Sequence, residues 1–202
     1  MRLRRSCLAV PGSNPKMLAK AAALPADMVF LDLEDAVAPL EKNDATRQNV
    51  VDALTGHEWT APTRVVRVND VSTVWCFRDI LAVVSGAKDS LDCLMIPKVQ
   101  GPDQVAFVHH LLNQLEAELG MTKRIGLEIQ IESARGAENL PAIAGALEAG
   151  GNSDYQIVKL AHLNHLFQTA QIGAPAEYSK IEETFAPVAL QVMGDWIVRH
   201  VK

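Results

Sequence analysis

The amino-acid sequence predicts an α/β fold, a TIM (β/α)8 barrel that is incomplete after its fifth or sixth unit. Short apolar runs alternate with helical stretches five times, at about 25 to 35 residues per unit, which is typical of parallel strands joined by helical crossovers. The runs are nearly continuously apolar, as expected for a sheet covered on both faces. Eight units need ~250 residues, so a chain of 202 residues has room for six or seven.

The composition is that of an ordinary globular protein. Hydrophobic residues make up 49% of the chain and charged residues 21%, so a core can form and disorder is not expected. The net charge of -5 argues against a broad nucleic-acid-binding surface, and no apolar run reaches the ~18 residues of a membrane helix. Three separate cysteines without a CxxC pair or a secretory signal are typical of a reducing compartment. We therefore expect a cytoplasmic protein with neither nucleic-acid nor membrane partners.

Five strands are predicted from apolar runs that end in Pro-Gly or in polar residues: 6–10, 27–35, 64–69, 93–98 and 124–132. A helix follows each of them: 16–24, 41–54, 74–84, 105–119 and 139–149. Pro15 stands near the first position of the first helix, where proline is favoured. Apolar residues repeat at helical spacing from Val105 to Leu119, and Gly120 ends that helix.

Residues 148–202 break this rhythm. A loop-like stretch, 150–155, follows the fifth helix, and no apolar strand precedes it. Helical pieces such as 181–193 come later, but no convincing strand does. We assign residues 1–202 to a single barrel domain and leave the register of 148–202 open, because barrel segments are lacking there.

Polar side chains gather at the carboxyl ends of the predicted strands: Asp32, Glu34 and Asp35, then Arg67 and Asn69, then Lys98, and finally Glu132. Sites in parallel α/β folds are built at these strand ends, so the set indicates a site. Three of the residues also have a structural interpretation. Asp35 could cap a turn, Arg67 could be an ion-pair partner, and Lys98 could be a solvated loop residue.

The last predicted strand carries a second polar pattern. Glu128, Gln130 and Glu132 alternate and so share one face, which lines a polar barrel interior or forms a solvated edge. Glu132 lies furthest along the strand and is the best placed to reach a site. Carboxylates on two different loops suit a hard cation such as Mg²⁺, and Glu132 with Asp154 is the candidate pair.

Other motifs are weak or missing. His162 and His165 are three residues apart and could ligate zinc, but two histidines on a helix surface are the preferred interpretation. The sequence contains no GxGxxG, Walker A or GxSxG motif. A Rossmann dehydrogenase, a P-loop enzyme and a serine hydrolase are therefore not expected.

Several segments resemble the citrate lyase β-subunit and malyl-CoA lyase family of HpcH/HpaI aldolase-like enzymes. They keep the family's order and spacing over residues 3–147: RSCLAVPGSNP (5–15), FLDLEDAV (30–37), Lys42 with Arg47, VRVN (66–69), MIPKV (95–99) and GLEIQIESARG (126–136). The last segment leans toward the malyl-CoA lyases. The resemblance implies a TIM barrel of the pyruvate/phosphoenolpyruvate-utilising type.

The resemblance also implies roles for individual residues. Arg67 would bind the substrate carboxylate or the thioester enolate oxygen. Glu132 and Asp154 would hold Mg²⁺. The cluster from Asp32 to Asp35 would lie beside the metal and help to orient its waters. Glu34 and Asp35, together with Arg67, are the catalytic candidates.

Coenzyme A and a neighbouring subunit complete the site that the resemblance implies. Lys16, Lys20 and Lys42 could meet the coenzyme A phosphates, although surface lysines are the competing interpretation. Lys16, Lys42, Arg67 and Glu132 are thus the substrate-binding candidates. Family members can take a carboxylate base from a neighbouring subunit, so we expect a homo-oligomer, a trimer or a hexamer.

The expected activity is that of a Mg²⁺-dependent carbon–carbon lyase. It would cleave a 3-hydroxyacyl-CoA (malyl-CoA, β-methylmalyl-CoA or citryl-CoA) to an α-keto acid and an acyl-CoA. Three alternatives stay open: a 2-keto-acid aldolase acting on free acids, a catalytically decayed subunit or scaffold of the same fold, and a phosphate-handling barrel protein. A Gly-rich phosphate loop would favour the last, and the sequence has none.

The end of the chain departs from the family pattern. Residues 167–173 resemble a segment near the family's barrel end, but Gln168-Thr169 replaces its His-Pro. The start of the sixth strand and most of the seventh unit would then be missing between Leu147 and Phe167. Because a true deletion would leave exposed edge strands, we favour the hypothesis that these segments are omitted from the sequence.

Overall fold

The structure is a computed structural model, and it describes residues 4–151, 160–164, 166–172 and 174–200. It divides into two compact units, Arg2–Tyr155 and Gln156–Lys202, each of which is described by itself. The assignment of residues 1–202 to a single barrel domain stays a prediction.

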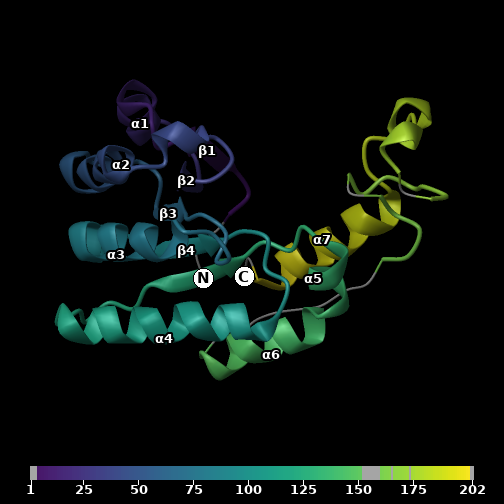
Figure 1. Cartoon of the computed structure of the whole chain (residues 1–202). Helices are drawn as coiled ribbons and strands as arrows, with labels where there is room; N and C mark the ends of the chain where they lie inside the picture. The colour runs from purple at the N-terminus through teal and green to yellow at the C-terminus, as the bar shows by residue number, and fades with distance from the viewer. Residues whose placement is uncertain (1–3, 152–159, 165, 173, 201–202) are drawn as a thin grey trace. The chain divides into compact units, whose positions relative to one another are not determined.

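Five parallel strands form the sheet of the first unit: β1 (Cys7–Pro11), β2 (Met28–Asp32), β3 (Thr63–Arg67), β4 (Cys93–Ile96) and β5 (Gly126–Ile129). Each strand pairs with the next one along the chain (Figure 1). A sequential parallel order is that of a (β/α)8 barrel, whereas a doubly wound sheet reverses its strand order. The predicted fold class is therefore confirmed, with five barrel units in the part of the chain that the structure describes.

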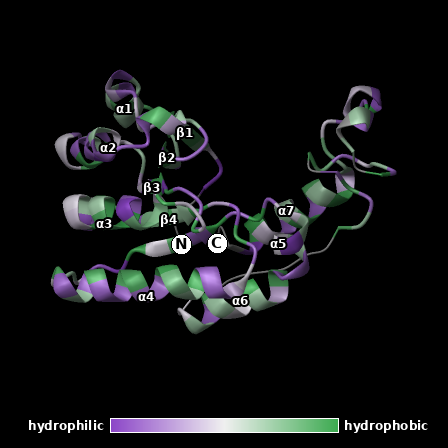
Figure 2. Cartoon of the chain, viewed as in Figure 1, coloured by the Kyte–Doolittle hydropathy of each residue, from purple (hydrophilic) through white to green (hydrophobic). Residues whose placement is uncertain are grey.

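Helices join the strands: α1 (Pro15–Ala22), α2 (Asp44–Gly56), α3 (Cys76–Ala87), α4 (Pro102–Glu118), α5 (Ala134–Glu138) and α6 (Leu140–Ala149). Short 3-10 turns, η1 (Pro39–Glu41) and η2 (Lys88–Ser90), complete the connections. Helix α4 carries both hydrophilic and hydrophobic residues along its length (Figure 2). Its buried residues, such as Val108 and Leu112, recur at helical spacing and pack in the main core.

The two faces of the sheet carry different cores, because side chains alternate along each strand. Residues such as Leu31, Val66 and Leu94 pack with the helices in the main core. The opposite face carries a smaller apolar cluster: Met28, Val65, Cys93 and Met95, with Phe30 against them. At the carboxyl ends of β2 and β3 this second face continues into Asp32 and Arg67, which are register partners.

Capping residues explain where helices begin. Asn14 and Asn43 accept hydrogen bonds from backbone N–H groups two or three residues inside α1 and α2, and Ser133 does the same for α5. Helix α5 is absent from the sequence prediction, because five residues are too few to show a helical period. Three predicted strands extend past the observed ones: the residues after Asp32 form a bend and a turn, and residues 68–70 and 130–132 have no regular structure.

The second unit contains η3 (Pro175–Lys180) and α7 (Pro187–His200). The predicted helix over 181–193 is thus wrong at its start. Proline is favoured in the first turn of a helix, and Pro187 opens α7. Before these helices, Asn164 Oδ1 accepts hydrogen bonds from the backbone N–H groups of Leu166 (2.9 Å) and Gln168 (3.0 Å).

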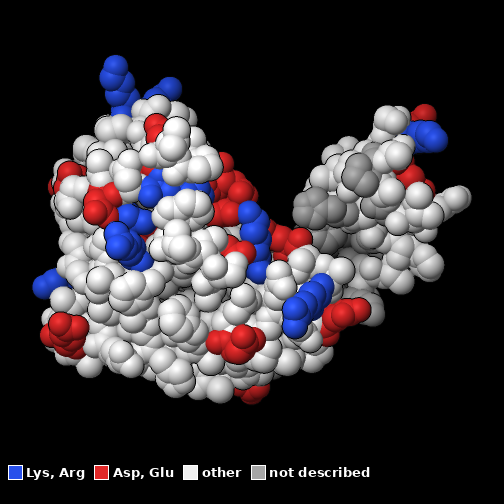
Figure 3. All heavy atoms as spheres, in the orientation of Figure 1, with Lys and Arg blue, Asp and Glu red and all other residues white. Residues whose placement is uncertain are grey.

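The surface view does not show one continuous basic face. Lys and Arg lie among Asp and Glu on the face shown in Figure 3. Among the described helices, none is both long enough and apolar enough to span a bilayer.

Candidate functional site

The candidate site starts at the turn that follows β2. Asp32 is buried, and its two carboxylate oxygens accept hydrogen bonds from the backbone N–H groups of Glu34 (2.8 Å) and Ala36 (2.9 Å). A short side chain that binds backbone amides two and four residues further on stabilises a tight turn. The turn therefore presents Glu34 and Asp35 at the carboxyl end of the sheet.

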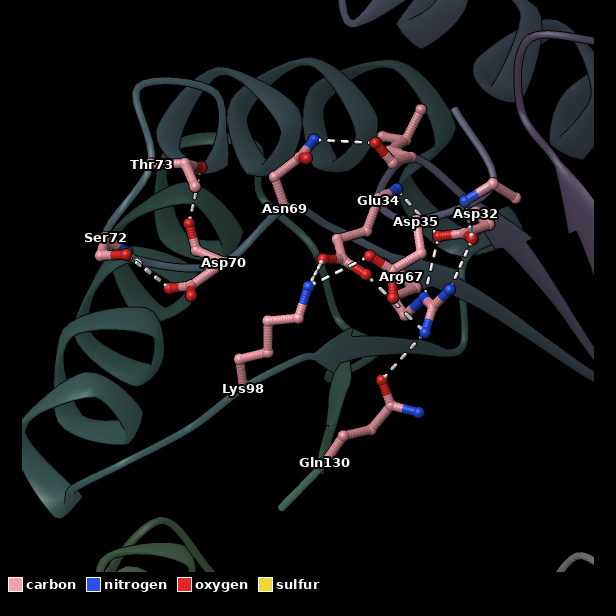
Figure 4. Close-up of polar contacts among 12 residues, drawn as sticks. Asp32, Glu34, Asp35, Arg67, Asn69, Asp70, Ser72, Thr73, Lys98 and Gln130 are labelled. Atoms are coloured by element: carbon pink, nitrogen blue, oxygen red, sulfur yellow. Dashed lines mark hydrogen bonds and ion pairs between the residues drawn. The ribbon is translucent and has the colours of Figure 1, made fainter. Parts of the chain in front are cut away.

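Arg67, at the end of β3, binds the same carboxylate side on. Its Nε lies 2.9 Å from Asp32 Oδ1 and its Nη2 lies 2.6 Å from Asp32 Oδ2 (Figure 4). The third nitrogen, Nη1, makes only longer contacts, at 3.5 Å to Gln130 Oε1 and 3.8 Å to Glu34 Oε2. Asp32 thus fixes the guanidinium plane, in the bidentate geometry that arginine favours, and leaves Nη1 as the less occupied donor.

Lys98 closes the cluster from β4. Its ammonium donates to Glu34 Oε1 and, at 3.1 Å, to Asp35 Oδ1 (Figure 4). Lys98 has a φ of 56°, in the left-handed region that a residue other than glycine occupies at some cost. Strain of ~1–3 kcal/mol is often kept where a side chain must be aimed at a site. Lys98 is therefore part of the cluster, although 40% of its side chain is exposed.

The pKa values of Glu34 and Asp35 are shifted in opposite directions. Burial is the main cause that raises the pKa of Glu34 above its usual value, and it outweighs the lowering effect of Lys98. For Asp35 burial also acts to raise the pKa, but hydrogen bonds from Lys98 and Glu34 bring it below the usual value. Hydrogen bonds to the same two acids raise the pKa of Lys98. The pair can thus hold one proton on Glu34 more readily than on Asp35.

A second polar network lies behind the turn. Lys42 donates to the backbone carbonyl of Glu34 (2.8 Å) and to Asn69 Oδ1. Asn69 is buried and donates in turn to Asp79 of α3 at 2.7 Å. Asp79 also accepts from Arg47 Nε at 2.7 Å. Asp79 was not among the residues predicted from the sequence, although an acid on the apolar side of α3, next to Ile80, was a usable signal.

The remaining predicted residues lie elsewhere. Glu132 is exposed, three residues beyond the end of β5, and has no hydrogen-bond or ion-pair partner among the described residues. Glu128, on β5, pairs with Arg4, and Gln130, the residue directly after β5, contacts Arg67. Lys16 is exposed on α1.

Three further predictions concern the part of the chain around residues 152–165. Asp154 and His165 lie outside the described residues. The helix expected around His162 is not observed, because His162 stands in a turn with a φ of 59°. Within the described ranges, no group of three or more His, Cys, Asp or Glu side chains could hold a metal ion.

A cavity of about 390 Å³ lies at the opposite end of the sheet. Residues from α4, from the start of β5 and from α6 line it, including His109, Glu116, Arg124 and Leu147. Ile125 and Gly126 are at the amino end of β5, whereas the polar cluster is at the carboxyl ends of the strands. The cavity and the cluster are therefore separate.

Comparison with known proteins agrees with this arrangement. Residues 5–163 match the family described as HpcH/HpaI aldolase/citrate lyase. The chain belongs to this family. The resemblance inferred from the sequence motifs is thereby confirmed.

Two curated family relatives illustrate the match. The L-malyl-CoA/beta-methylmalyl-CoA lyase of Cereibacter sphaeroides is 40% identical over 136 residues, which are 67% of this chain and 42% of that protein. The citrate lyase subunit beta of Leuconostoc mesenteroides subsp. cremoris is 36% identical over 148 residues, which are 72% and 47% of the two chains. The chain therefore spans less than half the length of these relatives.

A solved structure shares the fold. The malate synthase of Haloferax volcanii, in a magnesium/glyoxylate complex, has a TM-score of 0.62 and 22% sequence identity. The likeness covers 69% of this chain and 46% of the malate synthase chain. The described strands and helices thus follow an architecture known from a larger protein.

Proposed function

We propose that this chain belongs to a metal-dependent carbon–carbon lyase, which cleaves a 3-hydroxyacyl-CoA such as malyl-CoA to an α-keto acid and an acyl-CoA. The observation that carries the proposal is the Arg67 guanidinium, which Asp32 holds on two nitrogens while Nη1 makes only longer contacts. The family relatives named above include lyases of malyl-CoA and β-methylmalyl-CoA. A fixed arginine beside titratable acids suits the charge changes of such a cleavage.

The reaction removes a proton from the hydroxyl group, breaks one carbon–carbon bond and adds a proton to the carbon that is released. The hydroxyl group loses its proton, and the bond between its carbon and the carbon next to the thioester breaks. The electron pair of that bond passes to the thioester as its enolate, which then takes up a proton at that carbon to give the acyl-CoA. The hydroxyl carbon becomes the carbonyl of the α-keto acid. Arg67 Nη1 would donate to the oxygen that gains charge, or to the substrate carboxylate, without reorientation because Asp32 already fixes it.

Glu34 is proposed to exchange the proton. Its side chain is buried, and burial raises its pKa above the usual value, which makes it the better proton acceptor of the two acids. Asp35, with a lowered pKa, would stay ionised and keep the Lys98 ammonium in place. The two acids would thus have different roles.

A divalent cation, Mg²⁺ in our proposal, fits the donors at this end of the sheet. Glu132 offers an exposed carboxylate without a partner among the described residues, and Glu34 Oε2 is buried without a hydrogen-bond donor there. Mg²⁺ is usually held by one or two carboxylates plus water and substrate oxygens, so a complete protein cage is not required. Glu132 and Asp154 are the proposed ligands. When bound, the ion would polarise the substrate hydroxyl and carboxylate oxygens.

The remaining parts of the proposal concern coenzyme A and assembly. Lys16, exposed on α1, is the proposed contact for the coenzyme A phosphates. The active protein would be a homo-oligomer, a trimer or a hexamer, with a neighbouring subunit able to supply a carboxylate.

The test is cleavage of defined substrates. The purified chain would be mixed with malyl-CoA, β-methylmalyl-CoA, citryl-CoA or free malate, with Mg²⁺ or with a chelator, and α-keto acid release would be followed as its phenylhydrazone. We expect release from a CoA ester with Mg²⁺ only. Release from free malate would favour the aldolase alternative. No release, with no Mg²⁺ binding by calorimetry, would favour a decayed scaffold.

The metal assignment predicts the effect of Glu132→Ala. Turnover should fall at least about 1,000-fold, and the heat of Mg²⁺ binding should disappear, because a ligand carboxylate is lost. Glu138→Ala, which removes an exposed carboxylate from the neighbouring helix α5, is the control and should keep both. An unchanged rate in Glu132→Ala would contradict the assignment.

A further inference from the structure

We propose that Lys42 is a positioning residue, which fixes the turn carrying Glu34 and Asp35 and is itself held by Asn69 and Asp79. The proposal rests on the proposed function, since it assigns the two acids of that turn to the reaction. It differs from the expectation that Lys42 meets the coenzyme A phosphates.

The Lys42 ammonium is engaged inside the chain. It donates to the backbone carbonyl of Glu34 at 2.8 Å and to Asn69 Oδ1, and it lies 5.2 Å from the centre of the Trp75 ring. An ammonium group has three N–H donors, so two hydrogen bonds and an aromatic face occupy most of its capacity. Little of that capacity is left for a phosphate group.

Asn69 binds the residue that precedes Glu34 in the turn, and we call Lys42 and Asn69 together the clamp. Its Nδ2 donates to the backbone carbonyl of Leu33 at 2.9 Å, while its Oδ1 receives Lys42. Lys42 and Asn69 therefore bind the carbonyl groups of two successive residues. The N–H groups of the same turn are bound by Asp32, so its backbone is held on both sides.

Asp79 sets the orientation of Asn69. One of its oxygens accepts both the backbone N–H of Asn69 (3.0 Å) and its Nδ2 (2.7 Å), and the other accepts Arg47 Nε (2.7 Å). Both side chains of the Arg47–Asp79 pair are almost fully buried, at 5% and 2% exposure. Breaking a buried pair of this kind is costly, because it leaves a buried charge without its partner. A continuous series of polar contacts thus joins Arg47 of α2 and Asp79 of α3, through Asn69, to the turn.

The decisive variant is Lys42→Met, which keeps the length of the side chain and removes the ammonium. The turn should shift, and kcat should fall about 10- to 100-fold, because a misplacement of ~1 Å has effects of this size. The KM for the acyl-CoA should stay within about threefold, and Lys42→Arg, which restores a donor, should recover part of kcat. A raised KM with unchanged kcat would overturn the proposal in favour of a coenzyme A contact.

Lys123→Met is the matched control. Lys123 also donates to a backbone carbonyl, that of Asp89 at 2.7 Å, and to a side-chain oxygen, Asp92 Oδ1 at 2.8 Å. It acts at the amino ends of the strands, since Asp92 directly precedes β4. Equal losses of kcat in Lys42→Met and Lys123→Met would reduce the role of Lys42 to general stability and overturn the proposal.

A second readout does not need lyase activity. In Lys42→Met, hydrogen exchange of the Glu34 and Ala36 amides should be at least about tenfold faster than in the unaltered chain and in Lys123→Met, because the turn opens more often. Asp79→Asn, which turns one acceptor oxygen into a donor, should accelerate the same amides. If the unaltered chain cleaves no acyl-CoA but these amides respond, the proposed function fails and the clamp stands. Unchanged hydrogen exchange of these amides would contradict the proposal that Lys42 and Asn69 hold the turn.

Discussion

Single residues at the site are specified by shape as well as by charge. Asp32 and Arg67 form two hydrogen bonds in one plane, at 2.9 and 2.6 Å, and Arg67 also lies 5.3 Å from the centre of the Phe30 ring. A lysine has the same charge but neither the planar fork nor the stacking surface. The identity of residue 67 should therefore matter more than its charge.

Arg67→Lys tests this point. We expect kcat/KM to fall about 100-fold, equivalent to ~2.7 kcal/mol of transition-state stabilisation. Arg64→Lys is the control, because Arg64 pairs with Asp92 at the amino end of the sheet, away from the site. Steady-state kinetics on an acyl-CoA would check both variants. A value for Arg67→Lys within a factor of three or so of the unaltered chain would show that charge alone suffices.

The ionisation of Glu34 should lower the free energy of unfolding as the pH rises. Because burial raises its pKa in the folded state, the folded protein binds more protons than the unfolded chain at pH values between the two pKa values. Stability therefore falls as pH increases through that range. Glu34→Gln should remove this fall, so its gain in unfolding free energy should be larger at pH 7 than at pH 4, while activity is lost.

Urea unfolding at several pH values would measure the effect of Glu34→Gln. Glu118→Gln, on the exposed face of α4, is the control for removing one carboxylate. A gain in unfolding free energy that shrinks from pH 4 to pH 7 would contradict the raised pKa of Glu34.

At the scale of elements, α5 packs against the segment that carries Lys98. A Cβ at Gly136 would overlap the backbone carbonyl oxygen of Val99, which directly follows Lys98. The contact is with backbone, so no side-chain rotation can relieve it. Helix α5 and the segment after β4 can therefore approach each other this closely only because residue 136 is glycine.

Gly136→Ala should destabilise the chain by ~1–3 kcal/mol through overpacking and should reduce turnover by moving Lys98. Gly145→Ala in α6 is the matched control, since a Cβ there meets no atom within 4 Å. Alanine should stabilise that helix by up to ~1 kcal/mol. Thermal unfolding and the lyase assay would compare the two. Equal stability changes would contradict the predicted overlap.

At the scale of the whole molecule, stability should depend on the core between sheet and helices. Leu94 is fully buried on β4, which pairs with strands on both sides. Leu94→Ala should cost ~2–5 kcal/mol of unfolding free energy, from lost burial and the remaining cavity. Leu40→Ala, at a residue 95% exposed, should change it by less than ~0.5 kcal/mol. Similar values for the two variants in denaturant unfolding would contradict this account of the core.

Local patterns in the sequence predict the five units, their parallel order and the polar residues at the strand ends. These predictions follow from local periodicity. An apolar strand followed by an amphipathic helix can bury its apolar residues in few arrangements other than a parallel sheet covered by helices. The sequence also indicates the family, through motifs that keep their spacing. The sequence does not predict the exact ends of strands and helices. The strand expected to reach Glu132 ends at Ile129, and α5 begins shortly after it.

Which polar residues contact one another follows from the tertiary structure. Asp32 and Arg67 are 35 residues apart, and only the register of β2 against β3 brings them together. In the sequence, Lys42 looks like a surface lysine and Asp79 like an ordinary helix residue. In the structure, both form hydrogen bonds with Asn69, which also binds the turn. Hydrogen bonds act over about 3 Å, so they depend on positions that no local pattern encodes.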